Sequence, residues 1–195
     1  MRWDLLFDDL ESQLDQEQRD EERALAIEEE RLRLARLSLR ERLVAMAAES
    51  GAPLRLELAD GECRSIRPTG FGRDWLSGDL VDTAHGPRRC VLPLAAVAAV
   101  LPSREQVRAG LAPVAPRANA LQERIGLSFV LRDLCRRRSA VALTTAEGRF
   151  HGTIDRVARD HLDLAVHEPA VPRREREVRG YRIVPFERIR LVGFE

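Results

Sequence analysis

The chain has 195 residues, which is enough for one large domain or two small ones. Aromatic residues make up 5% of the composition, which favours small cores of Leu, Val and Ala over one large aromatic core. The formal net charge is zero.

The charge is unevenly distributed along the chain. Residues 1–38 contain 12 acidic and six arginine side chains, a net charge of −6, out of 32 acidic and 32 basic residues in all. The remaining residues therefore carry a net charge of +6. An acidic arm next to a mildly basic body indicates separate roles, or contact between the two.

The cysteines and the apolar segments favour a cytoplasmic protein. Cys63, Cys90 and Cys135 lie far apart, are odd in number and form no Cys-x-x-Cys motif. The sequence shows no signal-like apolar segment. The longest apolar run, Cys90–Leu101, is interrupted by Pro93 and is too short to span a bilayer. We therefore expect no membrane association.

The N-terminal segment from about Trp3 to Glu49 is predicted to be helical throughout, because it contains good helix formers and no Gly or Pro before Gly51. Its first part carries an apolar stripe at helical spacing, formed by Trp3, Phe7, Leu10 and Leu14. Such a stripe has no core of its own nearby. It predicts docking on the protein's own domain, on a second copy, or on another protein.

The rest of this helix is charged, with an imperfect heptad pattern. Leu25, Leu32, Leu39 and Met46 are seven residues apart, but Glu29 and Arg36 lie among the intervening positions. Two interpretations stay open for Glu28–Arg36. It is a solvated helix face, or it belongs to a dimerising or partner-binding arm.

Two β-rich segments follow. Gly51 and Pro53 end the helix, Asp60-Gly61 predicts a hairpin turn, and short strands are expected over residues 54–58, 62–69, 75–81, 88–92 and 97–101. Ser103 and Gln106 predict a capping box for a short helix that ends at Gly110. A proline-containing linker then leads to a helix expected from Asn119 to about Arg137.

The second β-rich segment has the same order of strands and turns as the first. Strands are expected over residues 141–145, 149–157, 162–166, 178–184 and 189–194. The turn Glu147-Gly148 corresponds to Asp60-Gly61, and Val184-Pro185-Phe186 corresponds to Leu92-Pro93-Leu94. We therefore expect an internal repeat of a helix followed by five short strands, which can close into a small barrel.

The second segment resembles the Sm-like fold, the family of bacterial host-factor RNA chaperones and eukaryotic Sm proteins. The resemblance lies in LTTAEGRFHGTIDRVARDHLDL, where Gly148, Gly152, Asp160 and Leu162 match the first family motif, and in YRIVPFERIRLV. It covers about residues 119–194, and less closely 39–101. Together with the helical N-terminal segment, it implies an α+β protein with a long N-terminal helix and two small five-stranded Sm-like or SH3-like β-barrels, each with a leading helix.

This sequence departs from the family at the positions that contact RNA. Asp163 stands near the place of the base-reading Asn, and Ser77 or Gly78 stands there in the first segment. The Arg-Gly of the second Sm motif is absent. The Tyr-Lys-His motif of the bacterial proteins is matched only in part, by Tyr181-Arg182. An acidic side chain repels phosphate, so the resemblance implies the fold more than RNA binding.

No catalytic constellation or cofactor is predicted. His151 and His161 could share one surface of a hairpin, but no Cys or carboxylate lies at metal-ligand spacing. Gly70-Phe71-Gly72 is not followed by a helix and so does not form a phosphate cradle. Trp75 is expected in a core or at a barrel rim. We expect a protein that is not an enzyme.

The predicted organisation is an acidic helical arm (1–38), a first helix-plus-barrel unit (39–102), a linker with a short helix (103–118) and a second unit (119–195). We expect an interaction module in which Trp3, Phe7, Leu10 and Leu14 bind a protein partner or a second copy. The alternative is RNA or DNA binding by the basic body, with candidate contacts at Arg136, Arg137, Arg138, Arg173, Arg174, Arg176 and Arg182.

Overall fold

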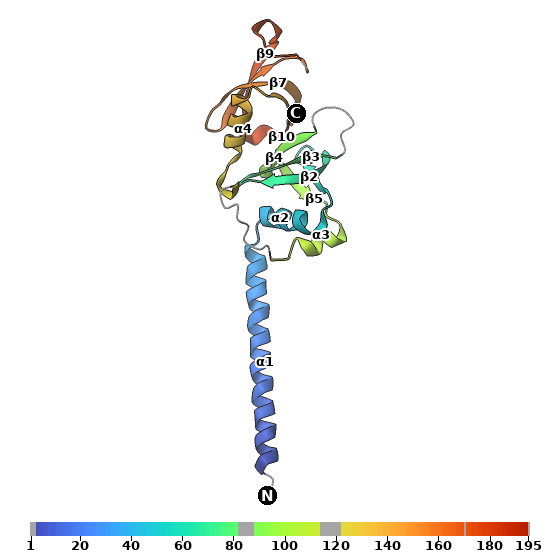
Figure 1. Ribbon diagram of the computed structural model, residues 1–195, viewed down its shortest axis with the longest axis vertical. Coiled ribbons are helices and arrows are strands. Elements are labelled where there is room, and N and C mark those ends of the chain that lie inside the picture. The colour runs from blue at the N-terminus through green and yellow to red at the C-terminus, as the bar shows by residue number, and fades with distance from the viewer. Residues whose placement is uncertain (1–2, 82–87, 114–121, 170, 195) are drawn as a thin grey trace. The chain divides into compact units, whose positions relative to one another are not determined.

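The computed structural model describes residues 3–81, 88–113, 122–169 and 171–194, with side chains described from residue 13 onward except Ser50 and Gln122. The chain divides into two compact units, Met1–Leu39 and Arg40–Glu195. The first is helical and the second holds all ten strands, so the protein is α+β with a long N-terminal helix (Figure 1).

The predicted helical segment is confirmed except for a short break. Helix α1 spans Trp3–Arg36, and helix α2 starts afresh at Leu39 and ends at Ser50, so helix covers the predicted range from Trp3 to Glu49 apart from residues 37 and 38. The sequence explains the break, because Ser38 and Glu41 stand at the first and fourth positions of a capping-box pattern, which starts a new helix. Ion pairs such as Arg19–Asp15 (3.6 Å) and Arg23–Asp20 (3.0 Å) support α1 along its surface.

All ten predicted strands are present. The first five are β1 (Leu54–Leu58), β2 (Cys63–Phe71), β3 (Trp75–Leu80), β4 (Arg89–Pro93) and β5 (Val97–Val100). The second five are β6 (Ala140–Thr145), β7 (Gly148–Val157), β8 (His161–Val166), β9 (Gly180–Pro185) and β10 (Ile189–Phe194). Short 3-10 turns η1 (Leu94–Ala96) and η4 (Phe186–Arg188) join the last two strands of each set.

The ten strands form one open antiparallel sheet in the order β5-β1-β2-β3-β4-β10-β6-β7-β8-β9. The expected division into two separate closed barrels is not confirmed. The reason is the pairing of β4 with β10, which places Val91 opposite Val192 and Cys90 opposite Gly193. Hydrogen bonds at this seam make the two sets of strands continuous.

The two sets nevertheless have the same internal order and corresponding irregularities. Within the first the order is β5-β1-β2-β3-β4, and within the second it is β10-β6-β7-β8-β9. The register shifts between Pro68 and Gly70 in β2, and between Ile154 and Arg156 in β7. It also shifts where β5 and β10 pair with the first strand of each set. These bulges bend the strands at corresponding places.

Each set of strands encloses its own apolar core, covered by the helix that precedes it. In the first core, Leu43 and Met46 of α2 pack with Leu56, Ile66 and Leu76. The second core contains Leu131 and Leu134 of helix α4 (Leu127–Arg136) together with the buried residues Leu143, Ile154, Leu162 and Leu164.

The two cores share side chains across the seam. Trp75 and Val91, from the first set of strands, belong to the second core. Leu191, from β10, belongs to the first core. Since both β4 and β10 direct apolar side chains to either face, each half buries part of the other.

Two short helices lie between the strand sets. Helix α3 (Arg104–Ala109) has Ser103 as its N-cap, a complete capping box with Gln106, and Gly110 as its C-cap, as predicted. The second helix differs from the prediction. Asn119 lies outside the described residues, Gln122–Arg124 is a 3-10 turn (η2), and α4 begins only at Leu127.

The first set of strands fixes the start of α4. The Leu127 N–H donates to the Asp74 carboxylate at 2.8 Å, a charge-assisted cap at a helix N-terminus. The Trp75 indole N–H donates to the Ile125 carbonyl at 3.0 Å. Phe129 of α4 matches the spacing of a buried helix face, yet it is 60% exposed. Helical spacing places Arg132 and Arg136 on the same outer face.

Close approach of backbones explains one glycine in the second set and yields a stability prediction. A Cβ at Gly152 would overlap the carbonyl oxygen of Ala165 on the neighbouring strand, whereas a Cβ at Gly180 would meet nothing. Gly152→Ala should therefore lower the free energy of unfolding by about 1–3 kcal/mol, the usual cost of overpacking. Gly180→Ala, the matched control, should change it by less than about 1 kcal/mol. Denaturant unfolding of both variants measures this, and equal stabilities would contradict the described β7–β8 contact.

Candidate interaction surfaces

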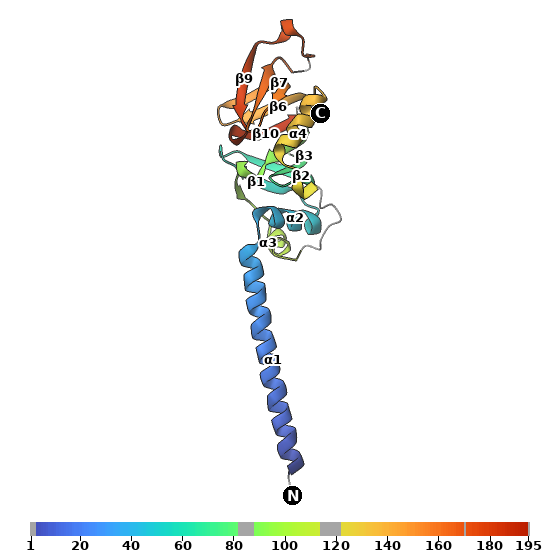
Figure 2. The ribbon, with the colours of Figure 1, turned by 90° about the vertical axis from the view of Figure 1, so that its left-hand side faces the viewer.

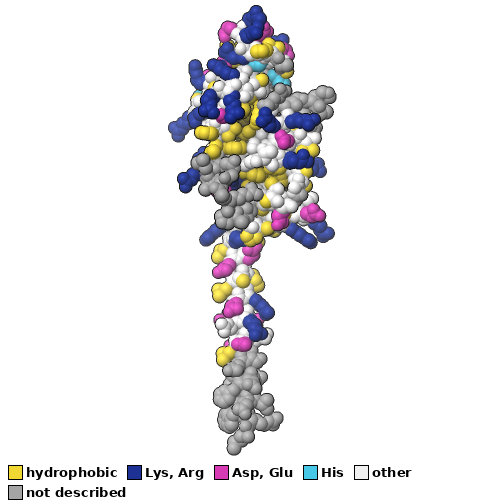
Figure 3. All heavy atoms as spheres, viewed as in Figure 1, with side chains coloured by type: hydrophobic (Ala, Val, Ile, Leu, Met, Phe, Trp, Pro, Cys, Tyr) yellow, Lys and Arg dark blue, Asp and Glu magenta, His cyan; other side chains and the backbone are white. Residues whose placement is uncertain are grey.

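Helix α1 carries the apolar residues proposed to bind a partner. The backbone of Trp3, Phe7 and Leu10 is helical, but their side chains lie outside those described; Leu14 is exposed. Leu25 and Leu32 lie within about 20° of Leu14 around the helix at 100° per residue. Figure 3 shows apolar, acidic and basic side chains alternating along the described part of α1.

A second pair of apolar side chains lies on the opposite side of α1. Ile27 and Leu34 are roughly 180–200° away from Leu25 around the helix. Leu25 is 65% exposed and Ile27 is 69% exposed. The side with Leu14, Leu25 and Leu32 is hereafter called the α1 line. It continues the Trp3, Phe7 and Leu10 stripe, because those residues lie within roughly 60° of it.

The arginines at the end of α4 are bound to a carboxylate. Arg136 and Arg137 both pair with Asp133, at 2.5 and 2.7 Å. Their positive charges also interact favourably with the helix C-terminus. Arg176 pairs with its neighbour Glu177 at 3.0 Å. These three candidates for nucleic-acid contact are thus partly neutralised.

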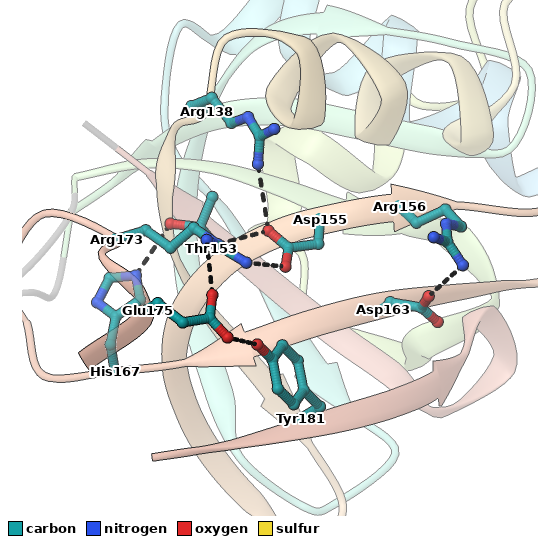
Figure 4. Close-up of polar contacts among 9 residues, drawn as sticks. All are labelled: Arg138, Thr153, Asp155, Arg156, Asp163, His167, Arg173, Glu175 and Tyr181. Atoms are coloured by element: carbon teal, nitrogen blue, oxygen red, sulfur yellow. Dashed lines mark hydrogen bonds and ion pairs between the residues drawn. The ribbon is translucent and has the colours of Figure 1, made fainter. Parts of the chain in front are cut away.

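Asp155 of β7 gathers two more of the candidate arginines (Figure 4). Arg173 donates to both carboxylate oxygens, at 2.8 and 2.7 Å, and Arg138 approaches one of them at 3.3 Å. The bidentate contact with Asp155 raises the pKa of the Arg173 guanidinium. Arg138 adopts a positive φ of 53°, which directs the chain from α4 into β6.

This cluster fastens the long connection between β8 and β9 to the sheet. Arg173 also lies 3.7 Å from Glu175, and the Tyr181 hydroxyl donates to Glu175 at 3.2 Å. Burial and the Glu175 carboxylate raise the pKa of Tyr181. At the start of the connection, buried His167 shares a 2.9 Å hydrogen bond with Thr153. These contacts give the side chains of the cluster a structural role, which is to hold the β8–β9 connection against the sheet.

The remaining candidates lie elsewhere on the second set of strands. Arg182 stacks over the ring of Phe150, 3.9 Å from its centroid, and Arg174 is exposed. Asp163 is paired with Arg156 at 3.6 Å. The structure therefore brings Arg138 and Arg173 together at Asp155, and Arg136 and Arg137 together at Asp133, but the seven arginines do not form one cluster.

Potential metal ligands do not cluster among the described residues. No group of three or more His, Cys, Asp or Glu side chains among them is placed to hold a metal ion. His161 bonds to Asp160 at 2.7 Å, which lowers the pKa of that carboxyl, and burial lowers the pKa of His151. No described helix is both long and apolar enough to cross a bilayer.

Sequence reasoning missed two features of this surface. The role of Asp155 depends on a contact with a residue 18 positions away, for which local spacing gives no signal. The exposure of β9 is the other, since Tyr181 and Ile183 are large apolar residues in a strand that was expected to be part of a closed barrel. Arg182 is a sequence signal for the exposure of β9, because it interrupts the apolar run of this strand.

No family model, curated protein or solved structure matches this chain. Function must therefore be argued from the surfaces themselves.

The anchoring role of Asp155 can be tested in the intact protein. Asp155→Ala should accelerate hydrogen exchange at the amides of Glu177 and Val178, whose bonds to Arg174 and Glu175 depend on a fixed connection. Asp163→Ala, which removes one longer contact from the next strand, is the matched control and should leave these amides unchanged. Equal exchange in wild type and Asp155→Ala, measured by mass spectrometry, would show that Asp155 does not anchor the connection.

Proposed function

We propose that this protein is a non-enzymatic interaction module in which helix α1 binds another protein chain, either a partner or a second copy, along the α1 line. The observation that carries the proposal is the exposure of the described part of α1. From Gln13 to Arg36 its side chains are exposed, apart from half-buried Arg33. A helix in a protein gains most of its stability by packing an amphipathic face, so α1 requires a binding surface.

The charge of α1 specifies the kind of surface. Residues 1–17 contain six acidic side chains and one arginine. Two such segments side by side would repel each other, because like charges at helix contacts are unfavourable. The complementary surface is an apolar groove with a basic rim. A partner could supply it, and so could residues 39–195 of a second copy, whose net charge is +6.

We also propose that each half of the body is an Sm-like or SH3-like unit and that the two halves form a tandem repeat. The support is the common strand order, the bulges at corresponding places and the 3-10 turn before each fifth strand. In such a module the strands form the body, and the binding helix α1 precedes them in the sequence. The repeat by itself does not specify a ligand.

The α1 proposal is tested by reversing the chemistry of the α1 line. Leu25→Glu with Leu32→Glu should abolish partner capture, or reduce self-association at least about tenfold, since burying an unpaired charge is costly. The measurements are a pull-down with the full chain as bait and light scattering of the purified protein.

The control places the same charges on the opposite side of α1. Ile27→Glu with Leu34→Glu introduces an equal charge change at exposures of the same order. This variant should bind as wild type does. Loss of binding in both variants would point to a general effect of charge, and loss in neither would contradict the proposal.

Nucleic-acid binding by the arginines of the body is the second candidate. Its support is the net charge of +6 on residues 39–195. Against it, five of the seven candidate arginines are engaged by carboxylates, which are Arg136, Arg137, Arg138, Arg173 and Arg176. RNA and DNA binding should be measured across salt concentrations. A steep loss of affinity with salt would favour this candidate, because phosphate contacts release counterions, and absence of binding would eliminate it.

A further inference from the structure

Helix α3 is fixed to the body on one side and open on the other. Gln106 is 3% exposed, and its Nε2 donates to the Pro53 carbonyl at 3.2 Å. A Cβ at Gly110 would lie 2.7 Å from Met46 Cε, so the end of α3 packs closely on α2. Both views show α3 beside α2, at the end of the body opposite β9 (Figures 1 and 2). The helix is therefore held in place while its other side faces solvent.

The exposed side of α3 combines an apolar residue with two arginines. Val107 is 41% exposed, and Arg104 and Arg108 lie roughly 60° and 100° from it around the helix. Neither arginine has a carboxylate partner among the described residues. These three residues are hereafter called the α3 face. Leu101 and Leu111, which flank α3 in the sequence, are exposed as well.

The α1 line carries the opposite charge. Glu21 and Glu29 lie one turn before and one turn after Leu25, within roughly 40° of it around the helix. Neither glutamate has an ion-pair partner among the residues with described side chains. Arg19 and Arg23 lie roughly 120–160° away from Leu25 and pair with aspartates there. The apolar line is thus bordered by unpaired carboxylates, as the α3 face is bordered by unpaired guanidinium groups.

We propose that the α1 line of one molecule packs on the α3 face of a second copy, with Leu25 against Val107 and the glutamates beside Leu25 toward Arg104 and Arg108. The inference rests on the proposed function, since it names the second copy as the partner of α1. Charge complementarity carries it, because opposed charges around an apolar contact steer the encounter and fix the register. Protein interfaces typically have this anatomy of an apolar centre and a polar rim.

The dimensions of the two surfaces agree. Arg104 and Arg108 are about 6 Å apart along α3, and Glu21 and Glu29 are about 12 Å apart along α1. The long arginine and glutamate side chains can span the remaining difference at each end. Every copy has both an α1 line and an α3 face. Two copies can therefore make the contact twice about a twofold axis, which is the commonest symmetry of protein dimers.

The outer face of α4 is the nearest rival on the body. Phe129 is 60% exposed there, and helical spacing places Arg132 and Arg136 on the same side. These arginines are already engaged, because Arg136 pairs with Asp133 at 2.5 Å and Arg132 donates to the Ala158 carbonyl at 3.4 Å. The α4 face therefore offers less uncompensated positive charge than the α3 face, and it provides a matched control.

Charge reversal tests the contact in the full chain, by sedimentation velocity over a range of concentrations. The wild-type protein should form a species of two chains. Arg104→Glu with Arg108→Glu should raise the concentration needed for association at least about tenfold, because like charges would then face each other. Glu21→Arg with Glu29→Arg should have the same effect. Circular dichroism checks that both variants keep the fold.

Mixing the two variants shows whether the contact joins two chains. In a mixed pair one contact keeps its original charges and the other has both signs reversed. The mixture should therefore associate at wild-type concentrations, which would also show that each variant remains folded. A mixture that stays as single chains, like its separate components, would overturn the proposal.

The matched control reverses two arginines one turn apart on α4. Arg132→Glu with Arg136→Glu should associate as wild type does, and it should not restore association when mixed with the Glu21→Arg, Glu29→Arg variant unless that variant binds its intact α3 face. Dissociation of the control to the same extent as the α3 variant would overturn the assignment of the α3 face.

The outcomes separate this inference from the proposed function. Single chains of wild type at every concentration would overturn the second copy as the partner, since α1 would then bind its own body or a different protein. Partner capture that is lost in the Leu25→Glu, Leu32→Glu variant would in that case still support the proposed function. Association that is lost in this variant but kept in the α3 variant would support α1 as the binding helix and overturn the α3 face as its receptor.

Discussion

The pairing of β4 with β10 is the constraint on which the rest of the body depends. It joins strands about 100 residues apart along the chain and places Val91 opposite Val192. Both strands contribute side chains to the two cores, so neither core is complete without the seam. The two sets of strands are thereby made into one body.

Other contacts reinforce this seam. Asp74, in the turn between β2 and β3, accepts a hydrogen bond from the first residue of α4, and Trp75 bonds to the carbonyl of Ile125. The helix that covers the second core is thus positioned by the first set of strands. The last strand of the chain must reach the seam before either core is finished, which gives the fold a long-range contact of the kind that slows folding. The polar cluster at Asp155 then fixes the outer connection of the second set.

Much of the architecture could be predicted from the sequence because it is encoded locally. Alternating Leu residues, the turns at Gly61 and Gly148, and the capping box at Ser103 each act within a few residues. The seam could not be derived in the same way, since it joins distant strands. A trace of it is present in the apolar runs Cys90-Val91-Leu92 and Leu191-Val192, which are typical of strands buried on both faces.

The candidate sites could be predicted less well than the fold. Arginine runs in the sequence favour a phosphate-binding patch, but carboxylates brought close by folding, such as Asp133 and Asp155, pair with most of them. Phe129 matches the spacing of a buried stripe yet is exposed, because α4 covers the core over a narrow face. The break after Arg36 has a local signal in Ser38 and Glu41. The helix-forming composition on both sides of these residues makes that signal easy to overlook. Local pairs such as Arg136 with Asp133, and distant pairs such as Arg173 with Asp155, together decide which of these arginines remain available for binding.

The central claim is that the seam makes the two halves of the body one cooperative unit. Native-state hydrogen exchange measures it directly, through the opening free energies of the amides of Leu56 and Ile66 in the first half and of Leu143 and Leu164 in the second. One unit predicts that the most protected amides of both halves open with the same free energy and respond equally to denaturant. Two groups of amides separated by more than about 2 kcal/mol would show that the halves unfold independently and would contradict the account.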